Sequence, residues 1–338
     1  MRIRALAVAF TIAVLTAHQV AASCGSATCP LDLNALNRPS AGGFTLDLSF
    51  EYIDQSHPRI GTRAAHVGEL HDEHHDEVRT VNRTTNLLLR YGVNDRLQFS
   101  VALPFISRAH DHLASSHTHV HATDVGALHN VIPESWSIHG TGDLMLQGRY
   151  ALFERGATES LWAMGGIKLP TGSHNHANDD GEVAETPIQP GTGSTDFIVG
   201  ISWEKGLLRT TAAQGPMGNT AMIPLFVSAT FRRNGSGAED YRVGNEWQLN
   251  AGSAYPLFSR VELLAQLNAR RKSRDFSPED GGLDPFTGGT FVYASPGLRF
   301  SGSRGAIYAL VQLPLYRDVN GIQLTSNRNF IIGAQTRF

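Results

Sequence analysis

The histidines are the side chains with the clearest capacity for chemistry, and they are unevenly distributed. The chain has 15 histidines in 338 residues, and apart from His18 all of them lie between His57 and His176. Several repeat at a spacing of two, which places imidazoles on one face of an extended segment. Two or three neutral imidazoles suit Zn²⁺, Cu²⁺ or Ni²⁺. We therefore expect metal ligands among His71, His74, His75, His110, His112, His117, His119, His121, His174 and His176.

Carboxylates lie among these histidines, as in the run from His71 to Glu77, and they would complete a coordination shell. No cysteine lies in this part of the chain, so a closed thiolate zinc site is not expected. The alternative is a set of solvated loops that respond to pH and have no specific ligand. Apart from a divalent transition metal, the sequence predicts no cofactor.

The two cysteines, Cys24 and Cys29, lie close together near the N-terminus. In an oxidising compartment such a pair is expected to form a local disulfide. A redox or metal-binding role is the alternative, and lipidation of Cys24 also stays open.

The N-terminal segment predicts export. Two arginines precede an apolar run from Ala5 to Ala17, and small residues follow that are suited to cleavage. The run is too short to span a bilayer as a helix, so we expect a signal peptide at 1–22. A periplasmic N-terminal arm with the cysteine pair should follow at 23–42, and a single domain should occupy 43–338.

Apolar and polar residues alternate with a period of two along the rest of the chain. In the first such segment Phe44 and Leu46 share one face, and Thr45 and Asp47 share the other. Strands in lipid need this pattern, because apolar side chains face the lipid and polar side chains face a wet lumen. The mean hydropathy of −0.18 agrees, since only alternate residues face lipid. The sequence predicts an all-β transmembrane antiparallel β-barrel, and a soluble β-sandwich is the alternative.

About twelve strands are expected, and single-chain bacterial barrels have an even number. The last strand ends on Phe338, which resembles the assembly signal of outer-membrane barrels. We expect an outer-membrane location of the Gram-negative type, with both termini periplasmic and with short periplasmic turns that include Asn94 and 253–256. Long extracellular loops are expected at 55–80, 108–138, 171–193 and 271–288.

Charged residues at inward positions should line the lumen of this barrel. They could pair with one another and fill the interior, or they could line a polar path, and the sequence leaves both alternatives open. The expected lumen charges are Asp47, Glu51, Arg90, Arg96, Asp143, Arg149, Lys168, Asp196, Arg242, Glu246 and Glu262.

Three glycine-rich stretches between positions 140 and 203 resemble a known family. They are Gly140-Thr141-Gly142-Asp143-Leu144, Gly166-Ile167-Lys168-Leu169-Pro170-Thr171-Gly172 and Gly191-Thr192-Gly193-Ser194-Thr195-Asp196. Together they are similar to the outer-membrane transporter family labelled "MetA-pathway of phenol degradation". The resemblance covers about a fifth of the chain. It implies a barrel with a transport role, and the family's label suggests aromatic compounds, but it brings no substrate and no catalytic residues.

Two functions follow from these patterns. The first is an outer-membrane channel or transporter whose His-rich extracellular loops bind a divalent transition metal for capture or passage. The alternative is a channel for a small organic solute, aromatic compounds included, with the histidines incidental. No Gly-x-Ser-x-Gly motif is present, so an enzyme is not expected. The expected partners are outer-membrane lipid, the barrel assembly machinery and a periplasmic protein at the N-terminal arm, and the net charge of −3 argues against nucleic acid.

Overall fold

The computed structural model describes residues 31, 41–69, 76–115, 131–156, 158–210, 220–278 and 281–338. The predicted signal peptide, Cys24 and Cys29 lie outside the described residues, so the signal and the disulfide stay predictions. Within the described ranges, no helix is long and apolar enough to cross a membrane. The helices found there are two short 3₁₀ turns, η1 (Thr186–Ile188) and η2 (Ala238–Asp240).

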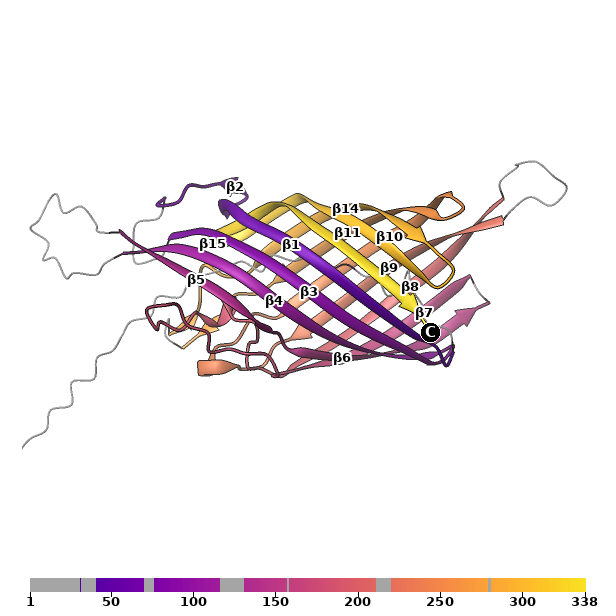
Figure 1. Cartoon of the computed structure of the whole chain (residues 1–338), viewed down its shortest axis with the longest axis horizontal. Helices are drawn as coiled ribbons and strands as arrows, with labels where there is room; N and C mark the ends of the chain where they lie inside the picture. The colour runs from indigo at the N-terminus through magenta and orange to yellow at the C-terminus, as the bar shows by residue number, and fades with distance from the viewer. Residues whose placement is uncertain are drawn as a thin grey trace, which may run out of the picture.

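Thirteen of the fifteen described strands form one antiparallel sheet that closes into a barrel (Figure 1), and the other two form a small sheet of their own. Each strand in the wall pairs with the next, and β15 pairs back with β1. The strands are β1 (Phe44–Gly61), β2 (Arg63–Ala64), β3 (Asp76–Asn94), β4 (Leu97–Ser115), β5 (Val131–Thr141), β6 (Leu144–Arg155), β7 (Glu159–Leu169), β8 (Asp196–Thr210), β9 (Thr220–Arg233), β10 (Glu246–Phe258), β11 (Val261–Lys272), β12 (Phe276–Ser277), β13 (Gly282–Leu283), β14 (Gly289–Ser301) and β15 (Gly305–Arg337).

The last element, β15, crosses the wall twice within its 33 residues. Its first part pairs with β14 as far as Val319, and its second part pairs with β1 from Val319 to Arg337. Gly321 lies at the reversal with a φ of 55°, a left-handed conformation that glycine adopts without strain. In the described residues the closed ring has eleven strands, with β5 outside the count, and twelve passes because β15 makes two. This confirms the predicted barrel of about twelve strands.

The strands β5 and β6 together make one pass along β4. The second half of β4, from Phe105 onward, pairs with β5, and its first half, up to Ala102, pairs with β6. The wall breaks between β5 and β6 at residues 142–143. Pro104 of β4 lies opposite this break, where its missing N–H costs no ladder hydrogen bond. The carbonyl of Pro104 still accepts a 2.8 Å hydrogen bond from the backbone of Gly142.

Side chains alternate between the two faces of the wall, as the sequence pattern predicts. On β8, Phe197, Val199 and Ile201 are each about half exposed on the outer face, whereas Ile198 and Ser202 on the opposite face are buried. Similar exposed apolar residues occur on the other long strands. The outside of the barrel is therefore an apolar belt of the kind that faces lipid.

At the end of the barrel that carries the C-terminus (Figure 1), tight turns join β3 to β4, β10 to β11 and β14 to β15, and the connection from β8 to β9 at 211–219 lies outside the described residues. In the turn after β3, the side-chain oxygen of Asn94 accepts backbone hydrogen bonds from Arg96 and Leu97, both 2.8 Å long. The predicted turn at 253–256 is wrong, because the pairing of β10 with β11 continues to Phe258. At the chain end, Phe338 exchanges backbone hydrogen bonds with Phe44, which closes the barrel.

The strands extend further toward the opposite end than the sequence indicated. β3 begins at Asp76 and β4 reaches Ser115, so parts of the predicted loops 55–80 and 108–138 are strand. Polar residues occupy both faces of these extensions, which hid the two-residue period. The centre of the second loop, 116–130, lies outside the described residues.

Candidate functional site in the barrel lumen

An ion-pair cluster lies on the inner wall where the break between β5 and β6 meets β7 and β8. The Lys168 amine lies 2.5 Å from a carboxylate oxygen of Asp143 and 3.2 Å from one of Asp196, and all three side chains are buried. The same amine donates a 2.7 Å hydrogen bond to the hydroxyl of Thr192. Because both carboxylates and the amine have close partners, the cluster is a fixed part of the wall rather than a set of free charges.

The glycine-rich stretches that carry the family resemblance meet at this cluster. A Cβ on Gly172 would lie 2.7 Å from the carbonyl carbon of Gly142 and 2.8 Å from the Cα of Gly191, so no larger residue fits there. Asp143 accepts backbone hydrogen bonds from Gly172 at 2.9 Å and from Thr192 at 3.1 Å. The stretches thus join the segment between β7 and β8 to the barrel wall.

Most other predicted lumen charges also lie on the inner wall and have partners that the sequence analysis missed. Buried Arg149 pairs with Glu204 of β8 and lies 4.0 Å above the ring of Trp162. The guanidinium of Arg270 donates a 2.6 Å hydrogen bond to Glu246. Glu204 on β8 and Arg270 on β11 stand at inward-facing positions of the two-residue alternation, and that pattern could have identified them as partners. Further predicted residues with inner-wall positions are Asp47, Glu51, Arg90 and Glu262, of which Asp47 accepts a hydrogen bond from Tyr308 and Glu262 pairs with Arg299.

Two predicted lumen charges lie elsewhere. Arg96 is exposed in the turn between β3 and β4, where it lies 3.4 Å from Glu154. Arg242 is exposed in the loop before β10, with its guanidinium carbon 5.4 Å from the centre of the Phe276 ring. Both were assigned by strand parity, and parity does not hold once the chain leaves the strand.

The segment between β7 and β8 folds inward and covers the end of the lumen opposite the C-terminus. Its Ala184 and Ile188 pack against Trp136 and Ile138 of β5 in a buried apolar cluster. The Trp136 indole donates a 3.2 Å hydrogen bond to the carbonyl of Glu182 in the same segment. The predicted extracellular loop 171–193 is therefore in large part a packed cover.

The described histidines do not form a metal centre. His110 and His112 lie in β4 as buried inner-wall residues rather than in a solvated loop, hydrogen-bonded to Thr80 at 2.8 Å and to Glu134 at 2.6 Å. His176 is hydrogen-bonded to Ser173, and His174 is exposed. In the described part of the chain, no three His, Cys, Asp or Glu side chains come together as a metal site would require. Predicted ligands outside that part are His71, His74, His75, His117, His119 and His121, so the loop-metal hypothesis stays a prediction.

The turn end of the lumen is narrowed by apolar side chains. Leu264, Tyr308, Leu310 and Ile331 form a buried cluster on the inner wall, and Leu31 packs against it. Leu31 comes from the predicted N-terminal arm, so at this residue the arm lies inside the barrel. The lumen is thus restricted at both ends.

Between these restrictions lies a cavity of about 550 Å³ with two different walls. One wall, from β3, β4 and β6, combines apolar residues with polar ones that include Arg90 and Arg108, and the other, from β9 to β11, carries paired charges. The apolar residues of the first wall are Leu88, Ala102, Pro104, Ile106 and Met145, and the charged wall includes Arg232, Glu246, Arg270 and Lys272.

No family model matches the chain, and no curated protein does either. An outer membrane channel from Pseudomonas putida F1 has a similar structure, with a TM-score of 0.61 at 13% identity over 88% of this chain and 96% of that chain. A FadL homologue from Pseudomonas aeruginosa aligns with a TM-score of 0.45 at 11% identity, over 90% of this chain and 93% of that chain. The CymD monoaromatic hydrocarbon channel aligns with a TM-score of 0.42 at 9% identity, over 93% and 94% of the two chains.

The closed antiparallel wall, the apolar outer belt and the first of these likenesses define the class of the protein. It is a transmembrane β-barrel of the outer-membrane type. This is the fold that the resemblance to the phenol-degradation transporter family implied.

Proposed function

We propose that the protein is an outer-membrane channel for small organic solutes that combine an apolar part with a polar part, aromatic compounds included. The observation that carries this proposal is the two-walled cavity of about 550 Å³ in the lumen. Pockets of this size hold small organic molecules, and apolar surface with a few fixed polar groups gives them their selectivity.

The restrictions at the two ends of the lumen support a selective channel rather than an open pore. The segment between β7 and β8 covers one end, and the apolar cluster with Leu31 narrows the other. Ion pairs hold the charged wall in place, so a solute would meet a preformed surface. The likeness to an outer membrane channel supports the transport role.

The proposal includes an orientation in the membrane. Tight turns lie at the end that carries Phe338, and outer-membrane barrels have short periplasmic turns and longer extracellular loops. The inward-folded segment would then cover the extracellular entrance. Metal capture by the histidine-rich loops has no part in this proposal, because the described histidines serve as packing and hydrogen-bonding groups.

The proposal can be tested with liposomes that contain the purified barrel. Benzenesulfonate and methanesulfonate carry the same permanent charge, and only the first has an aromatic ring. We expect wild-type barrels to pass benzenesulfonate faster, although it is the larger anion. Substituting Leu88→Asn together with Ile106→Asn should reduce that rate about ten-fold, because two apolar contacts are lost.

The matched control is Gln266→Leu, an inward-facing residue that does not line the cavity. It should leave the preference for the aromatic anion unchanged. Faster passage of methanesulfonate through wild-type barrels, as expected of a plain pore, would contradict the proposal.

A further inference from the structure

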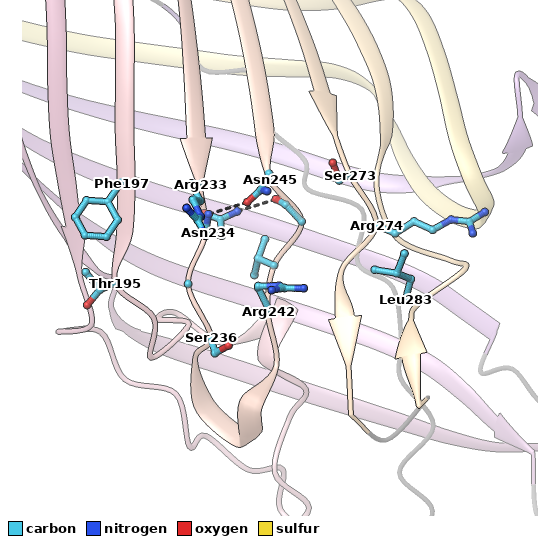
Figure 2. Close-up of a pocket in the computed structure, with 13 residues that line it drawn as sticks. Thr195, Phe197, Arg233, Asn234, Ser236, Arg242, Asn245, Ser273, Arg274 and Leu283 are labelled. Atoms are coloured by element: carbon cyan, nitrogen blue, oxygen red, sulfur yellow. Dashed lines mark hydrogen bonds between the residues drawn. The ribbon is translucent and has the colours of Figure 1, made fainter.

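A second hollow, of about 690 Å³, lies on the outer face of the barrel at the end opposite the tight turns (Figure 2). Its lining includes Phe197 of β8, Arg233 of β9 and residues of the segments that follow β9 and β11. Phe197 and Leu283 on its border are about 60% exposed. The hollow therefore opens toward the surroundings of the barrel on its Phe197 and Leu283 side, and it adjoins the lumen cavity through Asn234 and Val243, which line both.

Three arginines give this hollow its chemistry. Arg233, Arg242 and Arg274 line it, and no acidic residue does. In the described ranges none of the three forms an ion pair with a carboxylate. They come from β9 and the ends of its next two neighbours, and two strand spacings amount to about 10 Å. That distance separates their backbones, and guanidinium groups on long side chains suit an anion with several oxygens, above all phosphate, which arginine binds in a two-pronged manner.

The position of the hollow on the outer face indicates where that phosphate comes from. Next to it along the strands, Trp247 and Phe231 lie with ring centroids 4.7 Å apart, and Leu249 is about half exposed beyond them. Aromatic residues on the outside of a barrel mark the boundary between the hydrocarbon core and the headgroups. The arginines lie on the headgroup side of this boundary, at the level of lipid phosphates.

Hydrogen bonds hold the walls of the hollow in place. The side-chain amide of Asn234 donates to the carbonyl of Gly244 at 2.7 Å, which fixes the two ends of the loop between β9 and β10 (Figure 2). Buried Asp275 accepts hydrogen bonds from the Tyr241 hydroxyl and the Gly244 backbone, both 2.7 Å long. Burial and the Asp275 charge raise the pKa of Tyr241 well above its usual range, so this hydroxyl stays a donor at neutral pH.

We propose that this hollow binds the phosphorylated headgroup of a lipid in the outer leaflet of the membrane, with Arg233, Arg242 and Arg274 as its phosphate ligands. Phe197 would contact the first part of the acyl chains. This site takes a membrane lipid rather than a channel solute, so it goes beyond the proposed channel and does not depend on the solute. It relies only on the orientation that places the long connections outside the cell.

The test is native mass spectrometry of the full-length barrel with three lipids. These are lipid A with two phosphates, the same lipid with both phosphates removed, and phosphatidylglycerol. Wild-type barrel should retain one bisphosphorylated lipid, and the dephosphorylated lipid should bind at least about ten-fold more weakly. Changing Arg233→Gln together with Arg274→Gln should produce a similar loss, with folding checked by the gel shift between heated and unheated samples.

The matched control is Arg63→Gln together with Arg79→Gln, because these exposed arginines already pair with Glu69 and Asp54. This variant should bind the lipid as wild type does. Equal binding of the phosphorylated and dephosphorylated lipids to wild type would overturn the proposal even if the variants did not fold. Stronger binding of phosphatidylglycerol would overturn the outer-leaflet assignment, and displacement of the lipid by millimolar inorganic phosphate would reduce the hollow to a simple anion site.

Discussion

At the scale of single residues, the inner wall of the barrel is built from charges that neutralise one another. Lys168 forms ion pairs with two carboxylates, Asp143 and Asp196. Both carboxylates are buried, so water cannot readily replace the lysine amine as their partner. Strand parity predicted that these three residues face the lumen. It could not predict that they touch, because 25 and 28 residues of chain separate the carboxylates from Lys168 and only the closed wall brings them together.

Replacing Lys168 with methionine should lower the free energy of unfolding by about 3–5 kcal/mol, because two buried carboxylates lose their cation. The measurement is the urea concentration at half unfolding, followed by tryptophan fluorescence in lipid vesicles. Adding Asp143→Asn and Asp196→Asn to the same chain should restore part of the loss. Lys205→Met is the control, since Lys205 of β8 forms no ion pair among the described residues, and it should change stability by about 0.5 kcal/mol at most. An equal loss of unfolding free energy in Lys168→Met and Lys205→Met would contradict a stabilising role for the ion-pair cluster.

At the scale of elements, the sequence predicted the wall well and the cover poorly. A period of two is a local signal, and it gave the strands and their outward faces along nearly the whole chain. The break between β5 and β6 and the inward fold of the β7–β8 segment depend on contacts with distant residues such as Trp136 and Arg108. The segment looks like any polar, glycine-rich loop in the sequence, so its role as a cover was not predictable from the local pattern.

The inward-folded segment is held partly by Arg108, whose guanidinium donates to the carbonyl of Pro187 at 3.0 Å and to the side chain of Asn82. A hydrogen bond from a charged donor contributes about 1.5–3 kcal/mol, so Arg108→Ala should populate the open entrance at least about ten-fold more. The measurement is single-channel conductance in a planar bilayer, where open events should become more frequent.

Trp136→Phe offers a second variant, because it removes the hydrogen bond to Glu182 and keeps most of the packing. It should shift conductance in the same direction by a smaller amount. Arg79→Ala is the control, since this exposed arginine of β3 pairs with Asp54 and makes no contact with the segment among its described hydrogen bonds. Identical conductance in all three variants would contradict the role of the segment as a cover.

At the scale of the whole molecule, an apolar outside and a charged inside lead to one account. The belt sets the protein in a membrane, the paired charges fill most of the interior, and a two-walled cavity is left between restrictions at the two ends. Of the histidines, which are conspicuous in the sequence, His110 and His112 are part of the wall. The sequence indicated the belt and the lumen charges, but not how much of the lumen those charges and the cover would occupy.

The most direct test of this account is the reactivity of a single cysteine in the cavity. In a chain with Cys24 and Cys29 changed to serine, Met145→Cys would place a thiol in the lumen cavity, and Leu249→Cys would place one on the lipid-facing side as control. We predict that Met145→Cys reacts with a small water-soluble thiol reagent and that benzenesulfonate, but not methanesulfonate, slows this reaction. Leu249→Cys should react slowly and without protection by either anion. A thiol at position 145 that is unreactive, or that reacts at the same rate with and without the aromatic anion, would contradict the claim that this cavity is the path of the solute.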